Sequence, residues 1–155
     1  MLPKYFSHIH FEQTGKADVL SISSSPLLKP VNEQVVIKVS ASGVNGPDVV
    51  QRQGLYQAPI SASPILGLEV SGEIIAIGDQ MSQWKVGDKV CALVPGGGYG
   101  EYVLTQGSHC LPIPKGFTDL GAAALPETMF TVWGNLFGCG SFTSTDMITP
   151  LLSLF

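Results

Sequence analysis

The stretch Gly67-Leu-Glu-Val-Ser-Gly-Glu-Ile-Ile-Ala-Ile-Gly78 decides the fold class of this chain. It is an apolar run with a glycine at each end, which predicts a long β-strand bounded by turns. Upstream, the segment 33–41 predicts another strand, with Val35, Ile37 and Val39 on one face. Three side chains of that segment point to the opposite face: Val36, Lys38 and Ser40.

Shorter strands are expected downstream at 89–94 and 99–105, on either side of the loop Pro95-Gly-Gly-Gly98. Strands at this spacing favour a barrel or a sandwich. From about Leu120 the pattern changes to helix. Residues 119–125 predict a short helix that stops at Pro126, and 127–137 predict a longer one with apolar residues at helical spacing.

The composition is that of one globular domain. Apolar residues make up 45% of the 155 residues and charged residues 13%, which excludes an intrinsically disordered chain. Eight basic and twelve acidic residues give a net charge of -4 without a basic cluster, so no nucleic-acid partner is expected. The 18 glycines and 11 prolines favour short strands and turns over a helical bundle.

The N-terminal thirty residues contain no uninterrupted apolar stretch, so neither a signal peptide nor a membrane partner is expected. Three cysteines, Cys91, Cys110 and Cys139, form no C-x-x-C pair. Free thiols in a reducing compartment are the simplest explanation, which predicts a cytoplasmic protein.

Five motifs follow one another in a fixed order. They are Glu33-x-Val-x-Ile-Lys-Val-x-Ala-x-Gly-Val-Asn-x-x-Asp48, Pro64-x-Leu-Gly-x-Glu-x-Ser-Gly72, Val86-Gly-Asp-Lys-Val90, Gly98-Tyr-Gly-Glu-Tyr-Val103 and Thr131-Val-Trp133. This series resembles the medium-chain dehydrogenase/reductase superfamily, and within it the zinc-free quinone oxidoreductase branch. The resemblance implies a mainly β, GroES-like, partly open barrel with short helices, followed by a C-terminal helix.

The resemblance also implies a domain organisation. Residues 1–125 are expected to form the substrate-side barrel, and 126–155 a linker helix and the truncated start of a nucleotide-binding domain. No G-x-G-x-x-G or P-loop spacing occurs in the sequence, so a cofactor-binding Rossmann half is expected to be missing, through truncation, a premature stop or a frameshift. The uncharged tail 147–155 predicts a strand without its sheet, and its end 151–155 predicts self-association.

Metal binding receives little support. Alcohol dehydrogenase relatives place a zinc-binding Cys and His where this chain has Asn45 and Leu68, so no catalytic zinc is expected. Glu69 is expected to have a structural role, hydrogen-bonding a turn. His8, His10 and Glu12 alternate on an expected N-terminal strand, either as a metal-binding face or, more simply, as an exposed polar edge. His109 and Cys110 are neighbours on an expected strand and should face opposite ways.

The resemblance implies that the enzyme reduces quinones or conjugated carbonyls by hydride transfer from NADPH. It assigns Asn45, Asp48 and Tyr56 to the surroundings of the substrate, and Asn45 and Thr131 to the nicotinamide. Tyr56 would donate its hydroxyl proton to a quinone oxygen. NADPH binding by this chain alone is expected to be weak, because the phosphate-binding loop is missing.

Each of these residues also has a structural interpretation. Asn45 suits a turn, Asp48 a helix cap, Tyr56 the core, and Thr131 helix packing. Val50 stands where many quinone oxidoreductases carry a tyrosine. The alternative function is that of a catalytically inactive barrel acting as a binding or regulatory fragment.

Overall fold

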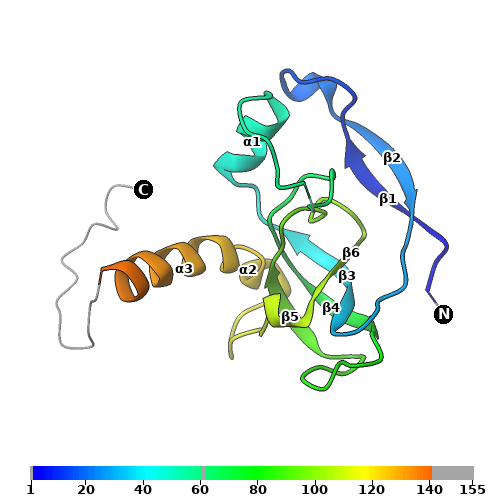
Figure 1. Ribbon diagram of the computed structural model, residues 1–155, viewed down its shortest axis with the longest axis vertical. Helices are drawn as coiled ribbons and strands as arrows, with labels where there is room; N and C mark the ends of the chain where they lie inside the picture. The colour runs from blue at the N-terminus through cyan, green and yellow to red at the C-terminus, as the bar shows by residue number, and fades with distance from the viewer. Residues whose placement is uncertain (1, 61, 141–155) are drawn as a thin grey trace.

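The computed structural model describes residues 2–60 and 62–140, which form a mainly β domain and a helical arm (Figure 1). The strands are β1 (Tyr5–His10), β2 (Ser21–Pro26), β3 (Gln34–Ser42), β4 (Glu69–Ile77), β5 (Lys89–Leu93), β6 (Tyr102–Gln106) and β7 (Cys110–Pro112). The helices are η1 (Ala17–Val19), α1 (Gly46–Arg52), η2 (Gly107–His109), α2 (Asp119–Ala122), α3 (Pro126–Trp133) and η3 (Gly134–Cys139). The expected fold class, mainly β with short helices and a C-terminal helix, is confirmed.

Five antiparallel strands form the main sheet, in the order β6-β3-β4-β5-β7. The two strands predicted most clearly, β3 and β4, pair at its centre. Val35 and Ile37 of β3 join the main core cluster, as the alternation predicted, and Val39 packs against it. Burying each such side chain completely stabilises the fold by about 1.5–3 kcal/mol. Val36, expected on the opposite face, is also fully buried, so β3 is covered on both sides.

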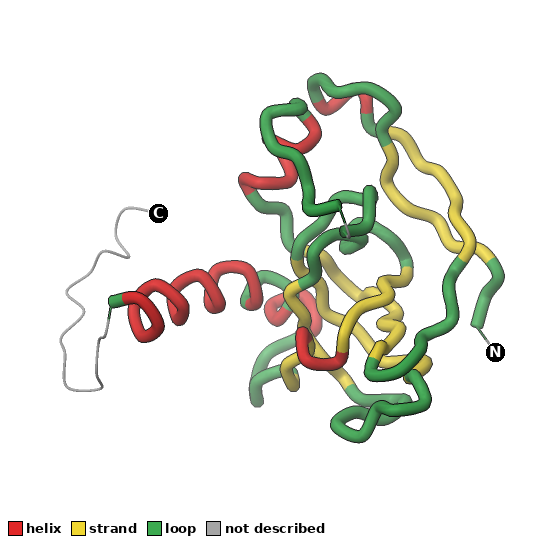
Figure 2. The backbone as a smooth tube through the Cα atoms, in the orientation of Figure 1, coloured by secondary structure: helices red, strands yellow, loops and turns green. Residues whose placement is uncertain are grey.

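A separate hairpin of β1 and β2 lies across one end of the main sheet (Figure 2). Backbone groups contribute to its link with the rest of the domain. His8 forms an isolated bridge with Gly100, and the Ile9 N–H donates to the Tyr99 carbonyl at 2.9 Å. The hairpin and the main sheet therefore enclose space between them while the barrel stays partly open.

Helices α2 and α3 pack against the sheet on the face that carries Ser71 and Lys89. Ser71 Oγ donates to the Asp119 carbonyl oxygen, and Lys89 Nζ lies 3.1 Å from Asp119 Oδ2. This lysine lowers the pKa of the Asp119 carboxyl by hydrogen bonding to it. From its first turn on the sheet, α3 runs outward, and η3 continues it (Figure 1).

Three expected boundaries were wrong. The strand expected at 99–105 begins at Tyr102, because the backbone of Tyr99 already bonds to Leu66 and Ile9 in a turn. The helix expected over 119–125 ends at Ala122, so it is not Pro126 that ends it. Pro126 occupies the first position of α3, where a missing N–H removes no helical hydrogen bond. The C-terminal helix continues to Cys139 as a π-helix.

Within residues 2–60 and 62–140, no helix is long and apolar enough to cross a membrane. The tail 147–155, expected to behave as a strand without its sheet, lies outside the described residues.

Gly72, in the middle of β4, allows the closest approach between the two central strands. A Cβ atom built there would overlap the Lys38 carbonyl oxygen of β3 and lie 2.9 Å from Ile37 Cγ2. We expect Gly72→Ala to lower the free energy of unfolding by about 1–3 kcal/mol, because the strands must separate to make room.

Urea denaturation would measure this effect, with Gly134→Ala as the matched control. Gly134 is helical (φ -61, ψ -42) and has open space around it, so this change should raise stability by about 0.5–1 kcal/mol. Equal effects of the two substitutions would contradict the close packing of β3 and β4.

Candidate functional site

The loop that enters α1 is closed by a reciprocal pair, Asn45 and Asp48. Asn45 is the N-cap, and its backbone N–H donates to Asp48 Oδ2 at 2.9 Å. The Asp48 N–H donates back to the Asn45 carbonyl oxygen at 3.2 Å. The sequence pattern predicted that Asp48 would help to cap this helix, and the structure confirms it.

Asp48 is a buried carboxylate, 3% exposed, with three donors around it. Besides the Asn45 N–H, its Oδ1 accepts from the Gly67 N–H at 3.0 Å and its Oδ2 from the Tyr99 hydroxyl at 2.9 Å. Burial, and then the hydrogen bond to Asp48, raise the pKa of Tyr99. The tyrosine therefore remains a neutral hydrogen-bond donor that joins the segments around residues 48, 67 and 99.

Glu69 is a second buried carboxylate, 2% exposed, at the start of β4. Its Oε1 accepts from Asn45 Nδ2 at 2.9 Å, and its Oε2 accepts from the backbone N–H of Glu127 at 3.0 Å. Glu127 lies in the first turn of α3. Glu69 thus connects the Asn45 loop to the N-terminus of α3, which confirms its expected structural role and extends it from a turn to a helix.

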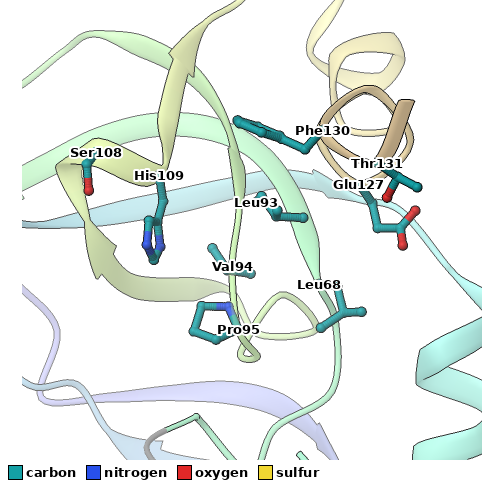
Figure 3. A pocket seen from close by; sticks show the side chains of 9 residues that line it. All are labelled: Leu68, Leu93, Val94, Pro95, Ser108, His109, Glu127, Phe130 and Thr131. Carbon is teal, nitrogen blue, oxygen red and sulfur yellow. The ribbon is translucent and has the colours of Figure 1, made fainter. Parts of the chain in front are cut away.

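Next to this bridge, a pocket of about 400 Å³ lies between the end of β5 and α3. Figure 3 shows Phe130, Glu127 and Thr131 on the α3 side and Ser108 and His109 beyond Leu93 and Val94. His109 Nδ1 lies 3.1 Å from Thr105 Oγ1, which holds the imidazole at the pocket wall. The nine lining residues are Leu68, Leu93, Val94, Pro95, Ser108, His109, Glu127, Phe130 and Thr131.

Four residues were assigned to the site from the sequence, and they differ in how close they lie to the pocket: Asn45, Asp48, Tyr56 and Thr131. Asn45 and Asp48 are in direct contact, and Glu69 connects Asn45 to the helix that carries Thr131. Thr131 lines the pocket. Tyr56 is 46% exposed in the segment after α1 and is not among the pocket-lining residues.

His109 is the main pocket residue that sequence reasoning passed over. The sequence predicted a strand containing both His109 and Cys110, but His109 ends the 3-10 turn η2, and only Cys110 begins β7. The turn directs the His109 imidazole into the pocket. Cys110 is buried instead, and this burial raises the pKa of its thiol to about 12. No local pattern in the sequence could have shown this, because the opposite wall comes from α3.

In the described part of the chain, no group of three or more His, Cys, Asp and Glu side chains is arranged to hold a metal ion. The expected exposed polar edge at His8 was wrong. This side chain is 6% exposed, and its Nε2 lies 2.8 Å from Ser25 Oγ on the paired strand.

Comparison with known protein families places residues 31–115 in the alcohol dehydrogenase GroES-like domain. The chain belongs to this family. The matched segment contains both buried carboxylates and the whole of the sheet from β3 to β7. The resemblance to zinc-free members of the medium-chain dehydrogenase/reductase superfamily is confirmed.

Three relatives illustrate the similarity. The GroES-like domain is 33% identical to mouse quinone oxidoreductase over 136 residues, 86% of this chain and 41% of that protein. It is 30% identical to the mycocerosic acid synthase-like polyketide synthase of Mycobacterium tuberculosis over 134 residues, 86% of this chain and 6% of that protein. It superposes on the CurK enoyl reductase crystal structure with a TM-score of 0.77 and 29% identity, covering 88% of this chain and 43% of that one. The chain therefore spans less than half the length of each relative.

The Glu69 bridge can be tested by removing one of its acceptor oxygens. Glu69→Gln keeps the shape but turns an NH2 group toward either the Asn45 amide or the Glu127 N–H, both of which donate. We expect the free energy of unfolding to fall by about 1–3 kcal/mol, and the amide resonances of Asn45 and Glu127 to shift.

Glu73→Gln is the matched control on the same strand. Its carboxylate is half-exposed and lies 3.9 Å from Lys89, so the change should stay within about 0.5 kcal/mol. Similar losses in both variants would show that Glu69 does not support the site.

Proposed function

We propose that this GroES-like domain is the substrate-side part of a zinc-independent, NADPH-linked oxidoreductase that reduces quinones or conjugated carbonyls by hydride transfer. The observation that carries the proposal is the pocket between β5 and α3, with an apolar floor and polar groups at its edges. The names of two relatives, a quinone oxidoreductase and an enoyl reductase, support the same substrate class.

The pocket walls suit a flat, uncharged electrophile. Leu68, Leu93 and Phe130 supply apolar surface, while His109 and Thr131 supply hydrogen-bonding groups at opposite ends. A donor at the carbonyl oxygen stabilises the negative charge that develops there as a hydride adds. Leu68 has no lone pair for a metal, and the Asn45 amide is engaged by Glu69, so stabilisation of the oxygen falls to hydrogen-bond donors.

The fit to NADPH is only partial. When bound, this cofactor would supply the hydride, and Thr131 and Asn45 are proposed to contact its nicotinamide. Within residues 2–60 and 62–140, no Lys or Arg lines the pocket, so the lining residues do not match the negative charge of the cofactor's phosphates. Phosphate binding is therefore assigned to residues outside this pocket.

Different roles are proposed for Asp48 and Tyr56. Asp48 is proposed as a positioning residue, because its oxygens already accept three hydrogen bonds that hold the Asn45 loop. Tyr56 stays a prediction as the proton donor to the substrate oxygen. A cytoplasmic location is part of the proposal, because the cysteines Cys91, Cys110 and Cys139 are all free.

Binding of a quinone to the purified chain tests the proposal directly. We expect 1,4-naphthoquinone, followed by amide NMR shifts, to give saturable shifts at Thr131, His109 and Leu93. Thr131→Trp fills the pocket from an exposed helical position and should weaken binding about tenfold or more. Thr128→Trp, on the same helix but outside the pocket, is the matched control.

Equal affinities of the two variants, or shifts confined to other regions, would contradict the proposed substrate site. Titration of nicotinamide fluorescence with the same protein should show weak NADPH binding or none. Micromolar affinity would show that the chain holds the cofactor by itself.

The alternative function is a non-catalytic fragment that associates with a second copy of itself. The supporting observation is the exposed apolar face of the helical arm, where Trp133 is 67% exposed and its ring packs 4.7 Å from that of Phe137. Leu111, Met129, Phe130 and Val132 border the same face. The tail segment 151–155, for which the sequence predicts self-association, lies outside the described residues.

For this alternative, we expect a dimer in size-exclusion chromatography with light scattering. Trp133→Glu should convert it to a monomer because a charge cannot be buried unpaired in an apolar contact. Thr128→Glu should leave the dimer intact. A monomeric wild-type chain at about 100 μM would rule out a stable interface of this kind.

A further inference from the structure

A second and larger cavity, of about 670 Å³, lies between the β1–β2 hairpin and the main sheet. Its walls come from the hairpin, from residues 62–65 and from β6. It shares no lining residue with the pocket beside α3. The segment 94–97 separates the two, because Val94 and Pro95 face the first pocket while Gly96 and Gly97 line the second. The volume lies within the usual range for small-molecule sites, about 300–1,000 Å³.

Aromatic rings form one wall of this cavity. Phe6 packs edge-on against Tyr102, with ring centroids 6.3 Å apart, and lies 5.6 Å from the His8 ring. Phe11 adds a further ring at the lining. Among the residues that the structure describes, no Asp, Glu, Lys or Arg lines the cavity, so a charged ligand would lose its hydration without an ion-pairing partner. A flat, neutral ring system is the chemistry that these walls accommodate.

Hydrogen bonding in the cavity differs between its two histidines. Both ring nitrogens of His8 are engaged, Nδ1 with the Ile9 carbonyl at 3.1 Å and Nε2 with Ser25 Oγ at 2.8 Å. The His10 ring packs edge-on against His8, with centroids 6.2 Å apart, and makes no hydrogen bond within the described residues. His10 therefore offers a hydrogen-bonding nitrogen at the cavity lining, and His8 offers only its ring surface.

We propose that this cavity is a second small-molecule site, which binds an uncharged, planar aromatic compound carrying a hydroxyl or carbonyl oxygen. The aromatic wall stacks against the ring system, and His10 hydrogen-bonds the oxygen. The site is independent of the proposed reaction, since it uses none of the residues beside α3.

The probe is 1-naphthol, titrated into the full chain and followed by amide NMR shifts. We expect saturable shifts at Gly96, Gly97 and Tyr102. Ala62→Trp, which fills the cavity from a half-buried position, should weaken binding about tenfold or more. Ala124→Trp, at an exposed position outside the cavity, should bind like the wild type.

A second comparison separates the contribution of the His10 hydrogen bond from that of the cavity shape. It does not require the Ala62 variant to fold. His10→Phe keeps an aromatic ring and removes the nitrogens, so it should weaken 1-naphthol about fivefold and leave naphthalene unchanged. The proposal is overturned if the three amides show no saturable shift, if they shift equally in both tryptophan variants, or if His10→Phe weakens both probes equally.

Discussion

The site depends on one buried carboxylate that accepts from two segments far apart in the sequence. Glu69 receives the Asn45 side-chain amide on one oxygen and the Glu127 backbone N–H on the other. A carboxylate buried to this degree is stable only when donors replace its lost water. Because both donors are supplied by protein, the loop before α1 and the start of α3 are held to the same end of β4.

Asp48 is a second buried carboxylate that accepts hydrogen bonds from separate segments of the chain. Its three donors come from the Asn45, Gly67 and Tyr99 segments, so these three turns are joined by hydrogen bonds to one side chain as well as by the sheet. The apolar core of β3, β4 and β5 supplies the rigidity. Glu69 holds the start of α3 beside β4, next to the opening between β5 and α3 where we propose that a quinone or conjugated carbonyl binds.

Much of the sheet was accessible to sequence reasoning, because its signals are local. The alternation in 33–41 and the glycine-bounded run 67–78 predicted β3 and β4 with small boundary errors. The start of β6 was missed since Tyr99 is drawn into a turn by partners more than thirty residues away. His109 and the burial of His8 were missed for the same reason, as both are set by chain segments that no short pattern contains.

The sequence by itself determined the family and the β-rich fold class, because these depend on residue type and spacing along the chain. Only the tertiary structure decided that Glu69 joins Asn45 to α3, that Thr131 but not Tyr56 lines the pocket, and that a second cavity lies under the hairpin. These hydrogen bonds and cavities form between segments that only folding brings together. Because the residues involved are tens of positions apart, the local spacing of residue types does not predict them.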